Sequence, residues 1–457
     1  MKQAWLSRVF PIAAIFSFRM LGLFMMIPVF SVAATSLTDA TPALIGIALG
    51  SYGLSQGLLQ MPFGFLSDRF GRKPILTIGL VLFAIGSLLG AYTDSIYGMI
   101  IARTLQGTGA IGSVLMALMA DLTPDEHRTK AMAVIGITIG ISFSLAMVIS
   151  PAITHHFGLS GIFYLTAILA IAGLFMLHTV IPTPKKEPFH VDNEVNPTLL
   201  KQVFKNNHLR RLNAGIFCLH LILTSTFFAI PFILQQQIKL GHLSLQWHFY
   251  LPLMICAFLA MLPFIILAEK KQKVKPVFLV AVAIMGLSQF ILAFTYNNWF
   301  SICGLMFTYF VAFNILEASL PSLVSKQANA TSKGTAMGMY SSAQFLGIFA
   351  GGAISGIIFQ FSGSQGIFII NSVIALLWFF IAIYMQPNLY QLTLIIPYHK
   401  PHQDEPGLIN LLRALPGVNE AVIAHEEEVI YLRVNKTTYQ NGSAEKLISD
   451  HQPGFCS

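Results

Sequence analysis

The chain has 457 residues, of which 55% are hydrophobic and only 10% charged, with a formal net charge of +8 and a mean hydropathy of +0.69. A soluble globular protein carries roughly 25% charged residues. So few charges cannot cover a water-facing surface, so the composition excludes an ordinary soluble protein and predicts one whose outer face meets lipid. The basic residues lie in short segments between apolar runs, as anionic lipid favours, and do not indicate a nucleic-acid partner.

Apolar runs divide the chain into candidate membrane spans, each close to the ~20 helical residues that cross a bilayer. Twelve such runs lie at residues 9–34, 44–66, 75–92, 96–120, 131–153, 162–181, 212–234, 249–268, 277–294, 300–324, 336–361 and 367–385. The first run is too long for a cleaved signal peptide and contains an arginine. We therefore predict an all-α polytopic membrane protein.

A charged stretch separates the runs into two groups of six. We expect an N-terminal six-helix bundle at 1–182, a cytoplasmic linker at 183–211, a C-terminal six-helix bundle at 212–387 and a small tail domain at 388–457. The two groups correspond to the two halves of a transporter in which one bundle rocks against the other.

Lysine and arginine placement predicts the orientation of the spans. Basic residues gather before the first span, after each even-numbered span up to the tenth, and in the linker, whereas the other loops contain only Lys239. Because loops rich in lysine and arginine stay in the cytoplasm, we expect both termini and the linker to be cytoplasmic.

The short loop between the second and third spans carries an ordered set of small and charged residues. It reads Gly-Phe-Leu-Ser-Asp-Arg-Phe-Gly-Arg-Lys from Gly64 to Lys73. Gly71 permits a tight reversal in a very short loop. Asp68, at the membrane edge, is placed to accept hydrogen bonds from a helix N-terminus, whose dipole favours an anion.

This loop resembles the G-x-L-a-D-r-x-G-r-k signature of the major facilitator superfamily. In that family the loop is a conformational latch between the two halves. The resemblance implies that Asp68 meets the start of the eleventh span near Gly334–Ala336, and that Arg72 pairs with Asp121. The implied latch residues are Gly64, Asp68, Arg69, Gly71, Arg72, Lys73 and Asp121.

The fourth and fifth spans carry two further motifs. The run from Arg103 to Ala110 resembles the family's fourth-helix arginine motif, which implies a role for Arg103 in proton coupling; a structural tie to a neighbouring helix is the alternative. Drug–proton antiporters of the superfamily have a G-P-x-x-G-G signature in the fifth span. Here Gly140 and Pro151 are present but the final glycines are absent, which leaves the direction of transport open.

Titratable residues inside apolar sequence are candidates for proton coupling. We expect Glu317, His220 and Arg19 to join Arg103 in this role, because charges inside a membrane are costly and usually functional. A simple salt bridge or a position near the cytoplasmic helix end remains open for Glu317, and a packing role for His220. The candidate cavity residues are Gln56, Gln60, Asn314, Tyr309, Tyr340 and Gln344.

The tail alternates strand and helix patterns in the order β-α-β-β-α, a ferredoxin-like plan without a clear last strand. Strands are predicted at 389–396, 417–423 and 429–434, and helices at 406–415 and 443–449. The cysteine pair of metal-carrying domains of this fold is absent, and the first loop offers only His399 and His402. We therefore predict a regulatory or docking module without a metal.

Together with these features, the family resemblance implies a proton-coupled transporter of a bacterial inner membrane that exports a small organic compound. The alternatives are a proton symporter, a uniporter, or a transporter-like sensor that signals through the tail. No serine–histidine–acid set, phosphate loop or metal cluster indicates an enzyme or a cofactor. We expect a monomer whose partners are its substrate, protons and membrane lipid.

Overall fold

The structure, a computed structural model, describes residues 6–123, 125–183, 197–271, 273–328, 332–385, 391–398, 405–424, 429–435 and 438–451. Residues 184–196 of the predicted linker and the tail residues His399, His402 and 425–428 lie outside these ranges. Contacts divide the chain into two compact units, Met1–Met385 and Gln386–Ser457, which are described separately.

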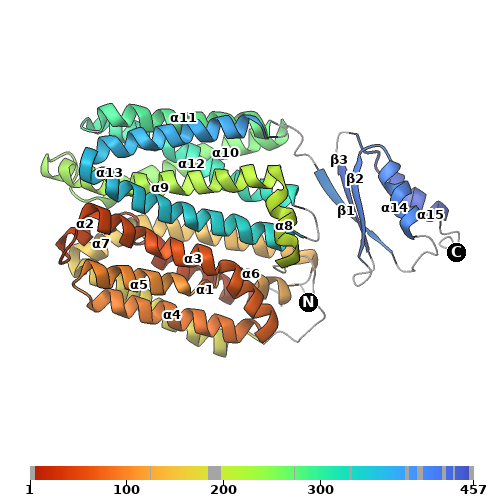
Figure 1. Cartoon of the computed structure of the whole chain (residues 1–457), viewed down its shortest axis with the longest axis horizontal. Helices are drawn as coiled ribbons and strands as arrows, with labels where there is room; N and C mark the ends of the chain where they lie inside the picture. Colours follow the sequence, from red (N-terminus) through yellow and green to blue (C-terminus); the bar gives the residue numbers. More distant parts are fainter. Residues whose placement is uncertain are drawn as a thin grey trace. The chain divides into compact units, whose positions relative to one another are not determined.

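Long helices build the first unit, and Figure 1 shows them in two groups. The N-terminal group holds α1 (Leu6–Phe24), α2 (Phe30–Ala33), the short 3-10 helix η1 (Ala34–Ser36), α3 (Pro42–Phe70), α4 (Arg72–Tyr92), α5 (Ile96–Thr108), α6 (Gly112–Asp121) and α7 (Asp125–Thr179). The C-terminal group holds α8 (Pro197–Lys205), α9 (Asn207–Lys239), α10 (Trp247–Lys270), α11 (Val274–Thr295), α12 (Trp299–Gln327) and α13 (Lys333–Ile383).

Two of these helices each contain two predicted spans. The 55 residues of α7 include Gly158, whose φ of 65° is outside the helical region. Before this glycine Ser150 hydrogen-bonds the Met25 carbonyl at the end of α1, and after it Gly173 lies beside Ile15. The chain therefore turns back along α1, and α7 is the fifth and sixth span. Helix α13 likewise turns at Gly363, with a φ of 59°.

The other predicted spans correspond to α1 with α2, α3, α4, α5 with α6, and α9 to α12. The first and fourth runs, expected to be continuous, are broken at 25–29 and 109–111. In the described residues, eight helices are long and apolar enough to cross a membrane, and the two that turn at glycines are among them. The predicted architecture of paired helical bundles is thus confirmed.

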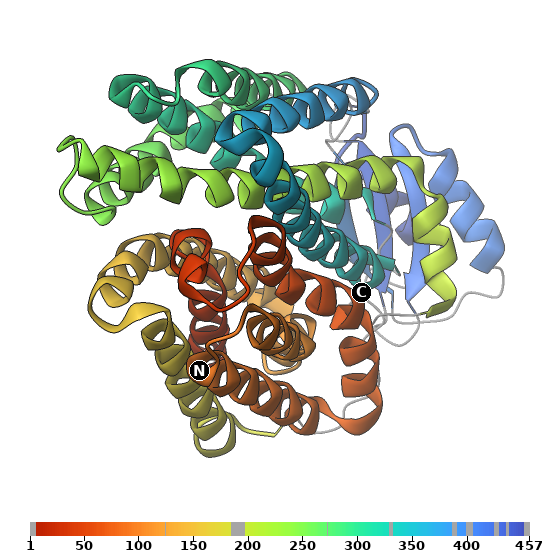
Figure 2. The same ribbon diagram turned by 60° about the vertical axis from the view of Figure 1, so that its left-hand side comes forward.

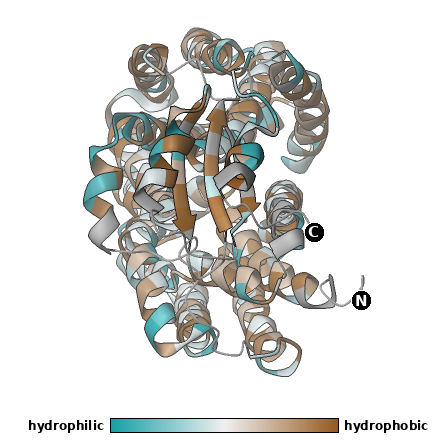
Figure 3. Cartoon of the chain, turned by 90° about the vertical axis from the view of Figure 1, so that its right-hand side faces the viewer, coloured by the Kyte–Doolittle hydropathy of each residue, from teal (hydrophilic) through white to brown (hydrophobic). Residues whose placement is uncertain are grey.

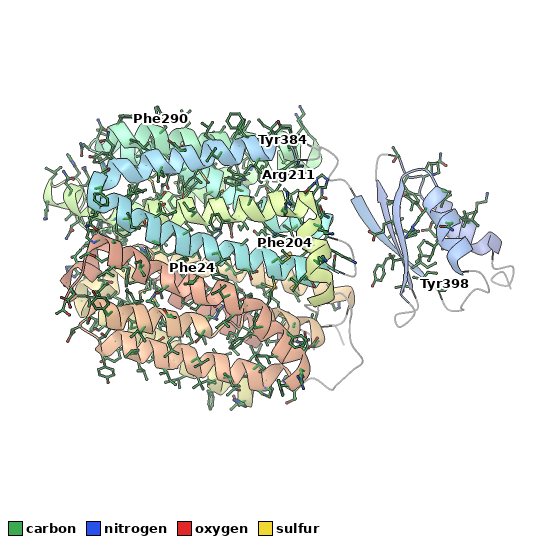
Figure 4. All side chains as sticks on the ribbon, in the orientation of Figure 1. Phe24, Phe204, Arg211, Phe290, Tyr384 and Tyr398 are labelled. Atoms are coloured by element: carbon green, nitrogen blue, oxygen red, sulfur yellow. The ribbon has the colours of Figure 1, made fainter. Side chains whose placement is uncertain are left out.

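Apolar side chains cover the outside of the bundles. On α11 Phe290 points outward and is 50% exposed (Figure 4). Other exposed large apolar residues are Ile78, Ile85, Phe258, Phe264, Phe294, Leu376 and Phe380. Colouring by hydropathy shows the same predominance of apolar residues along the helices (Figure 3). Such a surface is stable in lipid and would aggregate in water.

The two groups touch closely where α3 packs against α13 (Figure 2). A Cβ added at Gly46 would lie 2.3 Å from the carbonyl oxygen of Gly352, and one added at Gly50 would lie 2.7 Å from that of Phe349. Glycine at these positions lets two backbones approach, as small residues do in membrane helix pairs. This contact lies toward the start of α3, away from the loop at Gly71.

The second unit is a small α+β domain with its own core. Strands β1 (Gln391–Pro397), β2 (Val418–Ala424) and β3 (Val429–Asn435) form an antiparallel sheet in the order β1-β3-β2. Helices α14 (Glu405–Ala414) and α15 (Ser443–His451) complete it. The buried core includes Leu412, Ile430 and Leu432. The βαββα order and this strand order confirm the ferredoxin-like plan without its last strand.

Candidate transport site

Arg72 holds together three segments at the end of the N-terminal bundle where α3, α4 and α6 meet. Its Nε donates to Asp121 Oδ2 at 2.8 Å, and its Nη1 donates to Asp68 and to Ser67 Oγ at 2.8 Å. The Arg72 and Asp68 side chains are only 12% and 15% exposed. One guanidinium thus pairs with two carboxylates, one of which lies unfavourably at the C-terminus of α6.

The loop glycine Gly71 and the latch residues Gly64 and Arg69 lie close in sequence to this ion-pair cluster. Gly71 has a φ of 94°, which L side chains rarely adopt, and it links α3 to α4 without further residues. Gly64 is buried and its carbonyl accepts a hydrogen bond from Ser67 at 2.7 Å. Arg69 lies over the ring of Phe70. Asp68 pairs with Arg72; the resemblance also implies a contact with 334–336.

Arg103, on α5, is buried to 1% exposure. Its guanidinium carbon lies 5.0 Å from the centre of the Tyr52 ring, and its Nη1 donates to Gln106 Oε1 at 2.9 Å. Gln106 in turn donates to Ser87 Oγ on α4 at 2.8 Å. Arg103 therefore links three helices through a cation–π contact and an amide, and its Nε has no hydrogen-bond partner among the described residues.

Arg19, on α1, is also buried, with 2% exposure. Its Nη2 donates to Gln56 Oε1 on α3, and Gln56 Nε2 donates to Gln60 Oε1 at 2.6 Å. Tyr52, Gln56 and Gln60 are spaced four residues apart and share one face of α3. The structure thus brings two buried arginines and two candidate cavity residues to one polar stripe of α3.

The C-terminal bundle contains the second candidate cluster. His220 Nε2 on α9 lies 3.8 Å from Glu317 Oε2 on α12 and 2.8 Å from Gln344 Nε2 on α13. Glu317 Oε2 and the hydroxyl of Tyr340 are buried and have no hydrogen-bond partner among the described residues. The carboxyl is about ten residues, or ~15 Å, from the end of α12. It forms an ion pair with a histidine rather than an arginine.

Aromatic rings connect the two bundles beside this cluster. Phe24 on α1 packs edge-to-face on Phe143 of α7, with ring centres 5.1 Å apart. Phe143 stacks on Phe313 of α12 at 6.4 Å, and Phe313 lies 6.2 Å from the His220 ring. We call these three phenylalanines the aromatic bridge. It places the titratable pair next to the boundary between the bundles. Tyr309 stacks on Phe313 from within α12.

A buried polar network that the sequence analysis did not single out joins α9, α11 and the second arm of α13. Asn371 is fully buried and accepts from Ser225 Oγ at 2.8 Å. It donates to Gln289 Oε1 at 3.0 Å and to Thr226 Oγ1 at 3.3 Å. The available signal was one asparagine and one glutamine within otherwise apolar runs.

Known proteins share this architecture. The family described as Major Facilitator Superfamily matches residues 12–352 and 212–393. The chain belongs to the major facilitator superfamily. Its members are transporters, so the prediction of a transporter rather than an enzyme is confirmed.

Individual members resemble the whole chain or part of it. The inner membrane transport protein YajR of Escherichia coli (strain K12) is 40% identical over 438 residues, 96% of each chain. The class H tetracycline resistance protein of Pasteurella multocida is 36% identical over 107 residues, 23% of this chain and 26% of its own. The crystal structure of the nucleoside transporter NupG has a TM-score of 0.66 at 18% identity, with 83% of this chain and 98% of that chain covered. The last likeness shows the major facilitator fold alone.

Proposed function

We propose that the protein exports a small organic compound in exchange for protons, by alternating access between the two bundles. The observation that carries this proposal is the Glu317–His220 pair. A carboxyl in an apolar helix, paired with a histidine, can change protonation at moderate energetic cost, which a carboxyl held by arginine cannot. The aromatic bridge lies beside the pair, so rocking of the bundles changes its surroundings.

The buried arginine Arg103 of the N-terminal bundle complements the titratable pair of the C-terminal bundle. Arg103 keeps its charge in a buried site, and it is tied to Tyr52 on the stripe of α3. A fixed positive charge in one bundle and a protonatable carboxyl in the other give the two halves an electrostatic interaction that protonation of Glu317 weakens. Export is the direction suggested by the proton gradient of a bacterial membrane and by the partial match to a tetracycline resistance protein.

The sign of the proton coupling tests the proposal. The intact protein is reconstituted into liposomes, with a substrate chosen by a thermal-shift screen of metabolites and drugs. In an antiporter, protons that leave an acidic lumen drive substrate inward, so vesicles with an acidic lumen should accumulate it. One pH unit is worth about 1.4 kcal/mol and supports about tenfold accumulation at one proton per substrate. Accumulation in vesicles with an alkaline lumen would instead identify a symporter, and an indifference to pH a uniporter.

The cluster around Arg72 is proposed as the latch of the transport cycle. Arg72→Ala leaves Asp68 and Asp121 without their shared guanidinium, so we expect initial transport rates to fall about tenfold, the effect of about 1.4 kcal/mol. Asp121→Asn keeps the Asp68 partner and should have a smaller effect. Lys270→Ala, which removes an exposed charge at the end of α10, is the control. Equal rates for all three variants would contradict the latch, provided that equal amounts of folded protein are reconstituted.

A further inference from the structure

A break in the fourth span places the start of a helix inside the N-terminal bundle. Helix α5 ends at Thr108, and α6 begins at Gly112 and continues for ten residues. The residue before α6, Ile111, has no side chain that can accept from the first N–H groups. Leu115 N donates to the Ile111 carbonyl at 2.9 Å, which closes the first turn. The N–H groups of the first turn therefore have no acceptor within the helix, and they carry its positive dipole end.

The guanidinium of Arg19 lies against this helix start. A Cβ added at Gly112 would lie 3.4 Å from Arg19 Nη1 and 3.2 Å from Gln60 Nε2. Glycine at the first position of α6 thus leaves the helix start open toward both donors. Ser113 is tied to the same stripe of α3, because its hydroxyl donates to the Gln60 carbonyl at 3.1 Å.

Two nitrogens of the Arg19 guanidinium make no hydrogen bond within the described residues. Its Nη2 donates to Gln56, but Nε and Nη1 are buried and have no hydrogen-bond partner among the described residues. Side-chain carboxylates placed in the described N-terminal helices and loops lie at helix ends: Asp39, Asp68, Asp94 and Asp121. The two acids held by Arg72 are thus already paired. Burying a guanidinium without an anion costs desolvation free energy, and a negatively charged partner would offset that cost.

We propose that these groups bind the carboxylate of the transported compound. The site consists of Arg19, Gln60 and the first turn of α6 at Gly112 and Ser113, and we call it the Arg19 site. A guanidinium offers two parallel N–H donors that match a carboxylate, and broken membrane helices point their N-termini at anionic substrate groups. The inference deepens the proposed function and rests on it, since it assigns the substrate class as organic acids.

The Arg19 site lies in the N-terminal bundle, apart from the proton site at Glu317 in the C-terminal bundle. Arg19 and Gln60 are 2% and 3% exposed, so in this conformation a ligand has no path to them from water. Tyr52, on the same stripe of α3, contacts Phe345 of α13 with ring centres 6.3 Å apart. Separation of α3 from α13 during rocking would uncover the stripe. The substrate charge then meets Arg19 in one bundle, and the proton binds Glu317 of the other bundle in the opposite half of the exchange cycle.

Binding of a simple aromatic acid tests the assignment. The thermal unfolding midpoint of the intact protein in detergent is measured with benzoate, benzamide, benzylamine and chloride, in a carboxylate-free buffer of constant ionic strength. Benzoate should raise the midpoint by about 2 °C or more in a saturable manner, because a ligand stabilises the state that binds it. Benzamide has the same shape without the charge, and benzylamine has the opposite charge. Both should leave the midpoint unchanged.

Two variants locate the effect, and one controls for charge. Arg19→Gln should abolish the benzoate shift. Gly112→Ala keeps the arginine but places a methyl group between it and Gln60, so it should also abolish the shift while the unliganded protein stays folded. Lys239→Gln removes an exposed positive charge at the end of α9 and should preserve the full shift. If Arg19→Gln fails to fold, Gly112→Ala still decides the result.

Three results would overturn the Arg19 site. A benzoate shift that survives in Gly112→Ala, or no shift with benzoate in the unmodified protein, would overturn the Arg19 site. Chloride that stabilises as much as benzoate would also overturn it, because the site would then hold an inorganic counter-ion. The measurement uses no pH gradient, so it is independent of proton exchange. Benzoate binding with no response to a pH gradient would contradict antiport and leave the Arg19 site standing.

Discussion

Glu317→Gln should abolish proton-driven accumulation while the carrier still exchanges substrate down its gradient. Glutamine keeps the size and the hydrogen-bonding capacity of a protonated carboxyl, but it cannot release a proton. With about one pH unit across the vesicle, the unmodified protein should accumulate substrate about tenfold, and the variant should reach a ratio of about one. The measurement is the ratio of substrate inside and outside the vesicles at steady state.

Two controls separate coupling from damage. Exchange of labelled for unlabelled substrate, without a pH gradient, should continue in Glu317→Gln, since alternating access itself does not need the proton to leave. His220→Gln keeps Glu317 and removes only its histidine partner, so we expect it to shift the pH dependence of accumulation without abolishing it. Unchanged tenfold accumulation in Glu317→Gln would show that the proton binds elsewhere.

Gly352→Ala should shift the protein away from the conformation in which α3 and α13 touch. Its added Cβ would lie 2.6 Å from the Gly46 carbonyl oxygen, and backbone atoms cannot rotate aside as a side chain can. Overpacking of this kind costs about 1–3 kcal/mol, which corresponds to a change of roughly 5- to 150-fold in the ratio of two conformations.

Spin labels near this contact would report the shift. The native cysteines are replaced, and new cysteines are introduced at Thr35 and Ser362, both of which are exposed. The distance between the two spin labels is then measured by pulsed electron paramagnetic resonance. Gly352→Ala should add a population at longer distance. Gly304→Ala is the matched control, because an added Cβ there has no atom within 4 Å. A distance distribution unchanged by Gly352→Ala would show that this contact does not hold the bundles together.

The spans could be predicted because each is a long apolar run, and a single physical requirement, burial in lipid, selects such runs. The break at 109–111 could not, because the run from 96 to 120 stays apolar through it. Only Gly107 and Gly109 indicate an irregularity there, and Gly109 lies against the carbonyl of Gly79 on α4. A close backbone approach of this kind depends on a neighbouring helix, which one sequence does not reveal.

The candidate residues were easier to name than to group. Arg19, Gln56 and Gln60 stand out as polar residues in apolar sequence, but their contact depends on how α1 and α3 are rotated against each other. The pairing of Glu317 with His220 likewise joins helices almost a hundred residues apart. Arg72 and Asp121 were linked through the family resemblance, and periodicity alone would not have paired them. Asn371 was passed over because a single amide among apolar residues usually satisfies a local packing need.

The turns at Gly158 and Gly363 bear on how the protein is made. Each joins two helical arms, within the 55 residues of α7 and the 51 residues of α13. A reversal centred on one glycine holds the two arms of a pair side by side in the folded protein. We therefore expect each pair of arms to enter the membrane together during synthesis, as a helical hairpin.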